Sequence, residues 1–211
     1  MVKKSIISIL VLGMIVCWVS AVTAQSFHKK DGKIYLVDRH GESWDITQAV
    51  SLGFKPESFQ FGIGRDAIKP VDDTSLSDDR EFIFGSPRII GIENKDESHA
   101  YVISKLARHE IANTTIGDES VAVGYWPLVN LAAVYSREID GRKLTLAPSG
   151  WTYKSTFVLY DKETGSLWYP YNKGLMGIQG VYFKRWLEKR PFEDTDWKKW
   201  SKKFPETQIL K

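Results

Sequence analysis

The sequence predicts a mainly β fold of the α+β class: a single-domain antiparallel sheet or partly closed barrel with a few short helices. From Arg88 onward, short alternating apolar runs follow one another with turn residues between them. Apolar residues with helical spacing occupy only two short stretches, near residue 48 and near residue 200. The 211 residues are 43% hydrophobic and 26% charged, which excludes the disordered, collagenous, multi-pass membrane and disulfide-stapled classes.

Residues 1–24 have the pattern of a signal peptide. Lys3 and Lys4 precede an apolar run from Ile6 to Val19, and residues 22–24 supply small side chains at the positions that a signal peptidase reads. An uncleaved anchor is the alternative, but the run is shorter than the roughly 20 apolar residues that cross a bilayer. We therefore expect an extracytoplasmic protein, periplasmic or secreted, with no transmembrane anchor after cleavage.

Cleavage would change the chemistry that is available to the chain. The single cysteine, Cys17, would be lost, which excludes disulfides, cysteine-ligated zinc and thiol catalysis from the mature protein. Without Lys3 and Lys4, 27 of the 29 basic residues remain against 26 acidic ones. This near balance argues against nucleic-acid binding.

The first elements are expected in the N-terminal quarter. Residues 25–43 predict a strand and its lead-in, because Lys33 to Asp38 alternates between two turn signals. Asp45 is placed as the N-cap of a short helix that ends at Gly53. Residues 55–88 contain prolines and many acidic groups without a sustained period, and they predict a long loop with brief extended pieces.

Hairpins and one helix account for most of the remaining chain, so that residues 44–210 are expected to form one globular domain. The Asp140-Gly141 dipeptide is typical of a tight hairpin, because both turn positions need a positive φ. The expected strands are 88–93, 99–104, 120–126, 131–139, 142–147, 156–161 and 166–171. A helix is expected from Asp196 to Lys203, with Trp197 and Trp200 on one face.

Six ordered motifs carry a family resemblance. They are Gly64–Asp73, His99–Tyr101, His109–Asn113, Tyr125–Leu128, Ser149–Tyr153 and Tyr160–Trp168. With Trp197, Trp200, Pro205 and Leu210, the chain resembles the domain of unknown function 3179 family over about residues 44 to 210. The resemblance implies no established activity. It implies a pattern in which a Tyr-Cys-Pro-x-Cys motif follows a His-Glu-x-x-Asn motif.

The chain departs from this pattern at the cysteines. Trp126 and Val129 stand at the positions where the family typically has them. If relatives use that pair for a metal, a disulfide or redox exchange, this chain cannot do the same. Either the activity never depended on the thiols, or this member kept the fold and lost the chemistry.

His109 and Glu110 are the best acid/base pair that remains. If residues 104–113 are helical, His109 and Asn113 share a face, and they also share one if the segment is extended. Such a histidine could serve as a general base or bind a ligand. The structural alternative is that His109 satisfies buried backbone while Asn113 makes a turn.

Two acidic segments carry weaker signals. Arg65 and Asp66 follow Gly62-Ile63-Gly64, which predicts a tight turn with a fixed ion pair, but the glycines alone are weak evidence for phosphate binding. Asp72 and Asp73 show no diagnostic ligand spacing, so no metal and no cofactor is assigned.

Aromatic residues cluster on or beside the predicted strands, where they could line a ligand cleft or build the core. Ser149 lacks the motif of a serine hydrolase. The candidate ligand-binding residues are Arg65, Asp66, His109, Glu110, Asn113, Tyr125, Trp126, Ser149, Tyr153, Asp161 and Trp168.

We expect an exported protein whose pocket binds a small-molecule ligand or an envelope protein partner without thiol chemistry. The pocket is expected around His109, Asn113, Trp126, Tyr153 and Trp168. One alternative is a hydrolase- or lyase-type enzyme that uses His109 and Glu110, and another is a structural envelope protein. The sequence assigns neither a ligand nor a catalytic residue.

Overall fold

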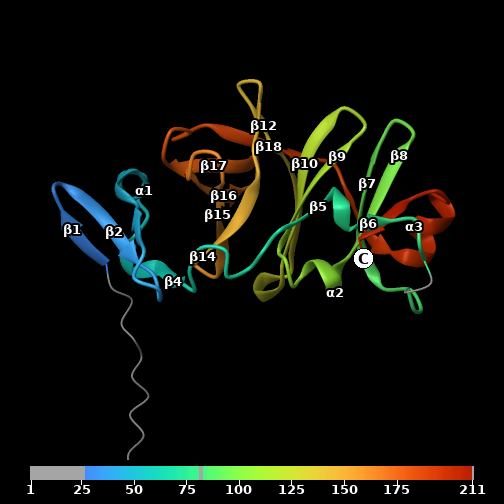
Figure 1. Cartoon of the computed structure of the whole chain (residues 1–211), viewed down its shortest axis with the longest axis horizontal. Helices are drawn as coiled ribbons and strands as arrows, with labels where there is room; N and C mark the ends of the chain where they lie inside the picture. Colours follow the sequence, from blue (N-terminus) through green and yellow to red (C-terminus); the bar gives the residue numbers. More distant parts are fainter. Residues whose placement is uncertain (1–26, 81–82, 211) are drawn as a thin grey trace, which may run out of the picture.

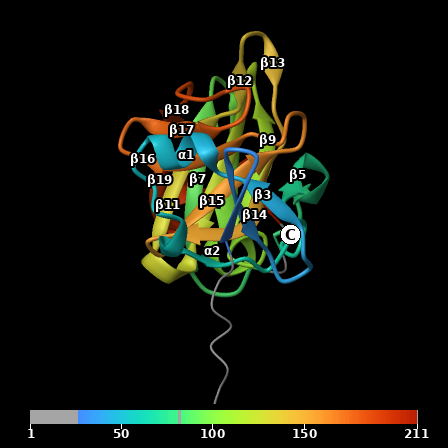
Figure 2. The same cartoon turned by 90° about the vertical axis from the view of Figure 1, so that its left-hand side faces the viewer.

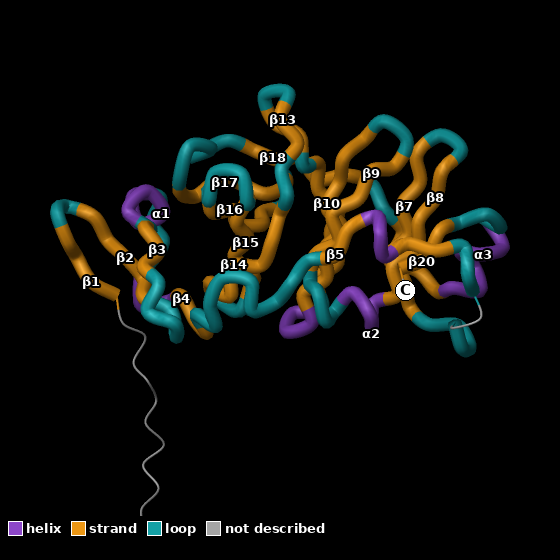
Figure 3. Tube along the Cα trace, in the orientation of Figure 1, coloured by secondary structure: helices purple, strands orange, loops and turns teal. Residues whose placement is uncertain are grey.

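The computed structural model describes residues 27–80 and 83–210, and strands dominate this part of the chain (Figure 3). Its α-helices are short: α1 (Thr47–Ser51), α2 (Ile103–Leu106) and α3 (Trp197–Lys203). None of the described helices is long and apolar enough to cross a membrane. The predicted signal peptide, residues 1–24, lies outside the described residues. The predicted mainly β fold with a few short helices is confirmed.

The largest sheet has ten strands and curls into a half-barrel (Figure 1). In spatial order the strands are β4 (Phe59–Phe61), β14 (Leu146–Tyr153), β15 (Thr156–Asp161), β16 (Leu167–Tyr171), β17 (Gly174–Gln179), β18 (Trp186–Arg190), β11 (Leu131–Ser136), β10 (Glu119–Trp126), β9 (Ile111–Ile116) and β5 (Val71–Asp72). Neighbours are antiparallel except β5 and β9, which are parallel. The predicted partly closed barrel is therefore confirmed.

Side chains close the half-barrel where β9 and β14 face each other without strand pairing. The Asn113 amide in β9 donates through Nδ2 to the Leu146 carbonyl and accepts from the Leu146 amide, both at 2.9 Å. Buried Arg137 donates to the carbonyls of Thr114, Val121 and Leu144 in the same region. Inside the half-barrel, inward side chains such as Ala122, Leu159 and Trp168 form one core cluster.

A second sheet packs on the outer face of β9, β10 and β11. Its order is β19 (Glu193–Asp196), β7 (Arg88–Asn94), β8 (Glu97–Val102), β20 (Gln208–Leu210) and β6 (Leu76–Ser77). Val121 and Val123 of β10 meet Ile90 and Tyr101 of this sheet in a core cluster, so β10 is buried on both faces. On the far side, Trp200 of α3 packs against Ile89.

The N-terminal part covers the opposite end of the half-barrel. A three-stranded sheet of β1 (Phe27–Lys30), β2 (Lys33–Val37) and β3 (Ser43–Asp45) packs over β14 and β15, and α1 lies against β17 (Figure 2). The predicted helix forms, but Ile46 is its N-cap, while Asp45 accepts from the Thr47 amide at 2.9 Å. Gln48 fixes α1 on the half-barrel, because its Oε1 accepts from the Gly180 amide.

Local signals placed most turns correctly. Asp140 and Gly141 have φ angles of 51° and 71° and join β12 (Glu138–Ile139) to β13 (Arg142–Lys143), as predicted. The hairpins β7–β8 and β15–β16 also form. Short 3₁₀ turns interrupt the loops: η1 (Pro56–Ser58), η2 (Asp73–Ser75) and η3 (Pro127–Val129). The strands without a counterpart in the sequence prediction include β9, β17, β18, β19 and β20.

Candidate functional site

A cavity of about 280 Å³ lies between the half-barrel and the loop that follows β4. We call it the Glu110 cavity, because Glu110 is its one titratable lining residue. Most of the other lining side chains are apolar. The lining residues are Phe61, Ile63, Ile68, Glu110, Trp126, Pro127, Leu128, Pro148, Gly150, Trp151, Thr152 and Val158. Such a lining, apolar with few polar groups, is typical of small-molecule sites.

An irregularity in β14 shapes one wall. The register of β14 against β15 shifts between Pro148 and Thr152, and Gly150 lies there with a φ of 79°. The Ile63 amide donates to the Gly150 carbonyl at 3.1 Å, which seats the loop on the strand. A Cβ at Gly150 would lie 2.7 Å from the Gly64 oxygen, so only glycine allows this approach.

Gly62 makes the same kind of approach on the loop side. It has a φ of 53°, and a Cβ there would lie 2.6 Å from the Trp151 ring. The loop therefore rests against Trp151 because two glycines leave room for it. This contact brings Ile63 and Ile68 into the cavity wall.

Glu110 occupies the turn between α2 and β9. Its backbone is held on both sides, because its amide donates to the Leu106 carbonyl at 2.8 Å and its carbonyl accepts from the Tyr125 amide at 2.9 Å. Its φ of 61° is in the left-handed region, which costs a non-glycine residue about 1 kcal/mol or more. Such strain is found where the surrounding structure enforces it, often at functional sites.

The Glu110 side chain is 4% exposed and makes no hydrogen bond or ion pair with any residue of 27–80 or 83–210. Burial raises its pKa to about 8. The carboxyl is therefore mostly protonated at pH 7, and it can donate its O–H as well as accept.

Two fully buried polar atoms of the cavity wall lack a protein partner. They are Nε1 of Trp151 and Oγ1 of Thr152, and both atoms are enclosed within the wall, without surface open to the cavity. The other buried tryptophans of the described chain all donate: Trp44 to Asp38, Trp126 to the Ser155 carbonyl, Trp168 to Asp161 and Trp200 to Thr207. A buried polar group without a hydrogen bond costs about 1–3 kcal/mol. These two unpaired atoms therefore set the cavity wall apart from the rest of the described interior.

The segment that replaces the family cysteines forms the rim. Trp126 packs edge-on against Phe157, with ring centroids 6.0 Å apart, and lines the cavity. Leu128 in η3 and Phe61 across the opening are 59% and 48% exposed. The mouth of the cavity is thus apolar and accessible to solvent.

His109 and Asn113 do not join this site. The predicted shared face is absent, because α2 ends at Leu106, Glu110 turns the backbone with a positive φ, and β9 begins at Ile111. His109 Nδ1 donates to the Lys69 carbonyl at 2.9 Å. Neither residue lines the cavity.

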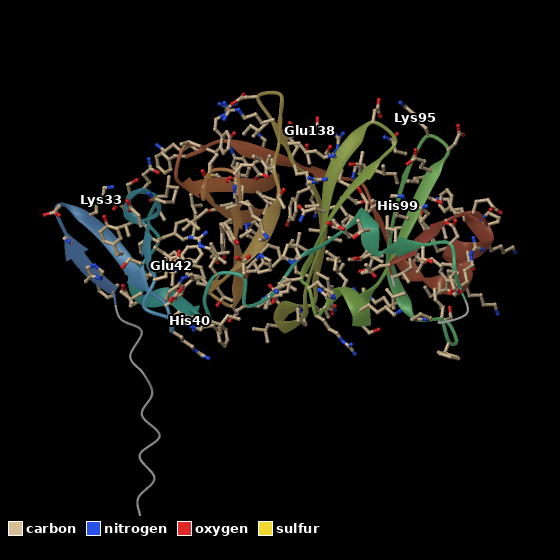
Figure 4. All side chains as sticks on the ribbon, in the orientation of Figure 1. Lys33, His40, Glu42, Lys95, His99 and Glu138 are labelled. Carbon is tan, nitrogen blue, oxygen red and sulfur yellow. The ribbon has the colours of Figure 1, made fainter. Side chains whose placement is uncertain are left out.

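Arg65 and Asp66 also lie elsewhere, and they do not form the predicted ion pair. Arg65 pairs with Glu42 at 2.8 Å, and its guanidinium lies 4.1 Å and 4.6 Å from the ring centres of Trp44 and Tyr160. The Tyr160 hydroxyl donates to Asp66 at 2.9 Å. Figure 4 shows Glu42 in the N-terminal part of the molecule, so these contacts fasten the loop to that part.

The remaining candidates make internal hydrogen bonds and do not line the cavity. Ser149 donates to the Val158 carbonyl at 2.6 Å, and Tyr125 donates to Asn130 at 3.1 Å. Tyr153 accepts from the Lys55 amide at 3.2 Å. Asp161 accepts from Trp168 at 2.9 Å. Of the predicted residues, the structure thus brings only Glu110 and Trp126 together in the Glu110 cavity.

Sequence reasoning missed the contribution of Thr152, Ile63 and Ile68. Thr152 belongs to the Ser-Gly-Trp-Thr-Tyr motif, in which the family resemblance and the aromatic residues are the evident signals and the hydroxyl is not. Within residues 27–80 and 83–210, no group of three or more His, Cys, Asp or Glu side chains is placed to hold a metal ion.

The family model described as protein of unknown function (DUF3179) matches residues 65–211, well over half of the chain. The chain belongs to the DUF3179 family. No curated protein and no solved structure matches it. The DUF3179 match begins at Arg65, so it includes Glu110, Trp126 and Trp151, while Phe61 and Ile63 precede it.

Proposed function

We propose that this DUF3179 protein binds a small, largely apolar molecule in the Glu110 cavity without thiol chemistry. One observation carries the proposal: the buried side chain of Glu110 lines a mostly apolar cavity and has no partner among the described residues. A ligand with one polar end would supply a hydrogen bond to Glu110. Its apolar body would cover Trp126, Leu128 and the neighbouring side chains.

The size of the cavity limits the ligand. An engineered apolar cavity of about 150 Å³ holds benzene, and the Glu110 cavity has about 280 Å³. A bicyclic molecule is therefore the expected size. The exposed rim of Phe61 and Leu128 leaves room for a substituent to extend into solvent.

The binding is proposed to take place outside the cytoplasm. The support is the basic, apolar and small-residue pattern of residues 1–24. Mass spectrometry of the protein from fractionated cells should find a mature N-terminus at residue 25. An intact N-terminus in the cytoplasmic fraction would contradict this part of the proposal.

Three commercially available bicyclic probes test the binding itself: indane, 1-indanone and 2-aminoindane. At least one should raise the melting temperature of the protein and shift the indole N–H resonance of Trp151, which Trp151→Phe assigns. Ile68→Trp fills the cavity from a half-buried loop position and should abolish both effects.

Val181→Trp is the matched control, because Val181 is 73% exposed and does not line the cavity. It should leave both effects unchanged. Absence of binding by all three probes, or equal binding to the Ile68→Trp variant, would contradict the proposed function.

A second candidate function is acid/base catalysis by Glu110, favoured by its burial, its left-handed backbone and its pKa of about 8. His109 would not take part directly, since it faces Lys69. In D₂O at pD 8, 1-indanone should then exchange hydrogen for deuterium next to its carbonyl. Mass spectrometry should show this exchange with the wild type and not with Glu110→Gln. Equal exchange with both would exclude it.

A further inference from the structure

We infer that the protein has a second binding site, for a linear polyamine, in a cavity at the start of β8. This cavity has a volume of about 450 Å³, and we call it the His99 cavity. Figure 4 shows His99 in the half of the molecule away from the N-terminal sheet. The cavity shares no lining residue with the Glu110 cavity, so the inference is independent of the proposed function. The lining residues are Asp78, Asp96, Glu97, Ser98, His99, Glu206 and Gln208.

Carboxyl groups from separate segments surround the His99 cavity. Asp78 follows β6, and Glu206 precedes β20. Asp96 lies in the turn between β7 and β8, and Glu97 begins β8. The side chains of Asp78, Asp96 and Glu206 make no hydrogen bond or ion pair with any residue of 27–80 or 83–210, and no lysine or arginine lines the cavity. A cleft with charges of one sign concentrates ligands of the opposite sign.

Buried His99 distinguishes this cavity from a solvated acidic surface. Its side chain is 4% exposed, and Nδ1 lies 3.3 Å from the Thr114 hydroxyl and 3.4 Å from the Tyr101 hydroxyl. Nε2 has no hydrogen-bond partner among the described residues, yet it is not one of their fully enclosed unpaired atoms, which belong to Trp151 and Thr152. The exposed part of the ring therefore includes Nε2, which faces the cavity.

The contacts of Nδ1 determine what Nε2 can do. Thr114 Oγ1 donates its hydrogen to Asp73, so it can only accept from His99. An N–H at Nδ1 satisfies the oxygens of both Thr114 and Tyr101, whereas a lone pair at Nδ1 would face a lone pair of Thr114. Burial lowers the pKa of His99, although Asp73 and Glu97 oppose this effect, so the ring is neutral at pH 7. Nε2 therefore carries a lone pair and accepts hydrogen bonds.

A buried acceptor that faces several carboxyl groups requires a positively charged donor. An ammonium group has N–H donors and no acceptor, so it can bind both Nε2 and a carboxylate. The carboxyl groups are spread over separate segments, and among residues 27–80 and 83–210 no group of three or more His, Cys, Asp or Glu is placed to hold a metal ion. Lys95, beside Asp96, is already paired with Asp118 at 2.9 Å. A linear polyamine, which has several separated ammonium groups, matches this arrangement.

Spermidine is the probe for the first test, and ¹⁵N NMR of the histidine rings in the whole protein at about pH 7.5 is the measurement. Before spermidine is added, Nε2 of His99 should have the chemical shift of an unprotonated nitrogen. Spermidine should then move the Nε2 resonance. The rings of His28, His40 and His109 are controls in the same spectrum and should not respond, because they do not line the cavity.

Titration calorimetry in low salt tests the carboxyl groups. Asp78→Asn combined with Glu206→Gln should weaken spermidine binding by about tenfold, since each exposed charge pair contributes about threefold. Both positions are exposed, so the fold should not change. Glu57→Gln combined with Glu138→Gln is the matched control, because it removes the same charge from exposed positions outside the cavity. It should leave the affinity nearly unchanged.

Four results would overturn the inference. Spermidine fails to bind, or both double variants lose affinity equally, which would mean attraction to net charge only. Nε2 of His99 is protonated or does not respond to spermidine, which would mean an acidic surface without a role for His99. In the last case, Zn²⁺ moves the Nε2 resonance and spermidine does not, so that the cavity is a metal site.

Discussion

Two places in this molecule bury a carboxyl group near a tryptophan, and they differ in one respect. At the end of β15, Asp161 accepts from the Thr164 amide at 2.6 Å, the Thr164 hydroxyl at 2.7 Å and Trp168 Nε1 at 2.9 Å. At the Glu110 cavity, neither the Glu110 carboxyl nor Trp151 Nε1 has a hydrogen-bond partner among the described residues. The hydrogen bonds of Asp161 are all made within the folded chain, whereas the carboxyl of Glu110 is left without a partner at the cavity.

The difference teaches that burial alone does not identify a site. Asp161 and Trp168 are fully buried and were candidate ligand-binding residues, yet their polar groups serve the turn between β15 and β16. Glu110 is also buried, but its backbone is strained and its side chain has no partner among the described residues. We therefore expect substitutions at the two places to change stability in opposite directions.

The largest effect is expected for Asp161→Ala. The substitution leaves the buried Trp168 Nε1 and two partly buried Thr164 donors without this acceptor, so the free energy of unfolding should fall by about 3 kcal/mol. Urea denaturation would measure it. Asp161→Asn retains one acceptor oxygen and should cost less. Equal stability of Asp161→Ala and the wild type would show that this corner does not hold the turn.

Glu110→Gln should do the reverse at neutral pH. The pKa of Glu110 is raised from 4.5 to about 8, so the folded state binds the extra proton and wild-type stability falls by about 1.4 kcal/mol per pH unit between these values. Glutamine has no such dependence, and after the cost of its own buried amide it should be about 2 kcal/mol more stable at pH 7.

The matched measurement is urea denaturation of both proteins at pH 4.5 and pH 7. At pH 4.5 the advantage of Glu110→Gln should disappear, because Glu110 is not yet titrating in the folded state. An equal difference at both pH values would mean that the burial of Glu110 does not control its ionisation.

Trp44→Phe removes one hydrogen bond from a second buried carboxylate, Asp38, and a smaller effect is expected. Burial alone would raise the pKa of Asp38, but hydrogen bonds from Trp44 Nε1 and from the Glu42 and His40 amides lower it overall. Its contribution is therefore present above pH 3.8 and is lost as the pH falls through the folded-state pKa. Trp44→Phe should cost about 1 kcal/mol at pH 7. Denaturation at pH 2 should show a smaller loss than at pH 7, and the opposite order would contradict the assignment.

The smallest effect is expected for Arg65→Lys. Lysine keeps the charge near Glu42 but loses the planar stack on Trp44 and Tyr160, which contributes about 0.5–1 kcal/mol at a partly exposed position. Thermal denaturation in high salt should retain the difference, because stacking is screened less than the ion pair. A difference that vanishes in salt would assign the effect to Glu42.

Much of the fold could be predicted because its signals are local. The Asp140-Gly141 turn and the strand β10 are each determined by residues that are neighbours in the sequence. The cavity could not be predicted in this way. It depends on a bulge at Gly150, on a loop more than 80 positions earlier that packs there, and on a turn at Glu110 that belongs to neither a helix nor a strand. Glu110 was recognised as a titratable residue, but its isolation from other charges exists only in the folded chain.

The clamp that Asn113 forms on Leu146 has a geometric consequence. Paired strands lie about 4.8 Å apart. β9 and β14 do not pair with each other, and the Asn113 side chain connects them through its two hydrogen bonds to Leu146. The circumference of the half-barrel along this seam is therefore set by a side chain and not by strand spacing. Glu110 directly precedes β9, and Gly150 and Trp151 lie in β14. All three residues line the cavity, so the cavity lies next to the seam between these two strands. A hydrogen-bonded ladder along the same seam would draw these walls together.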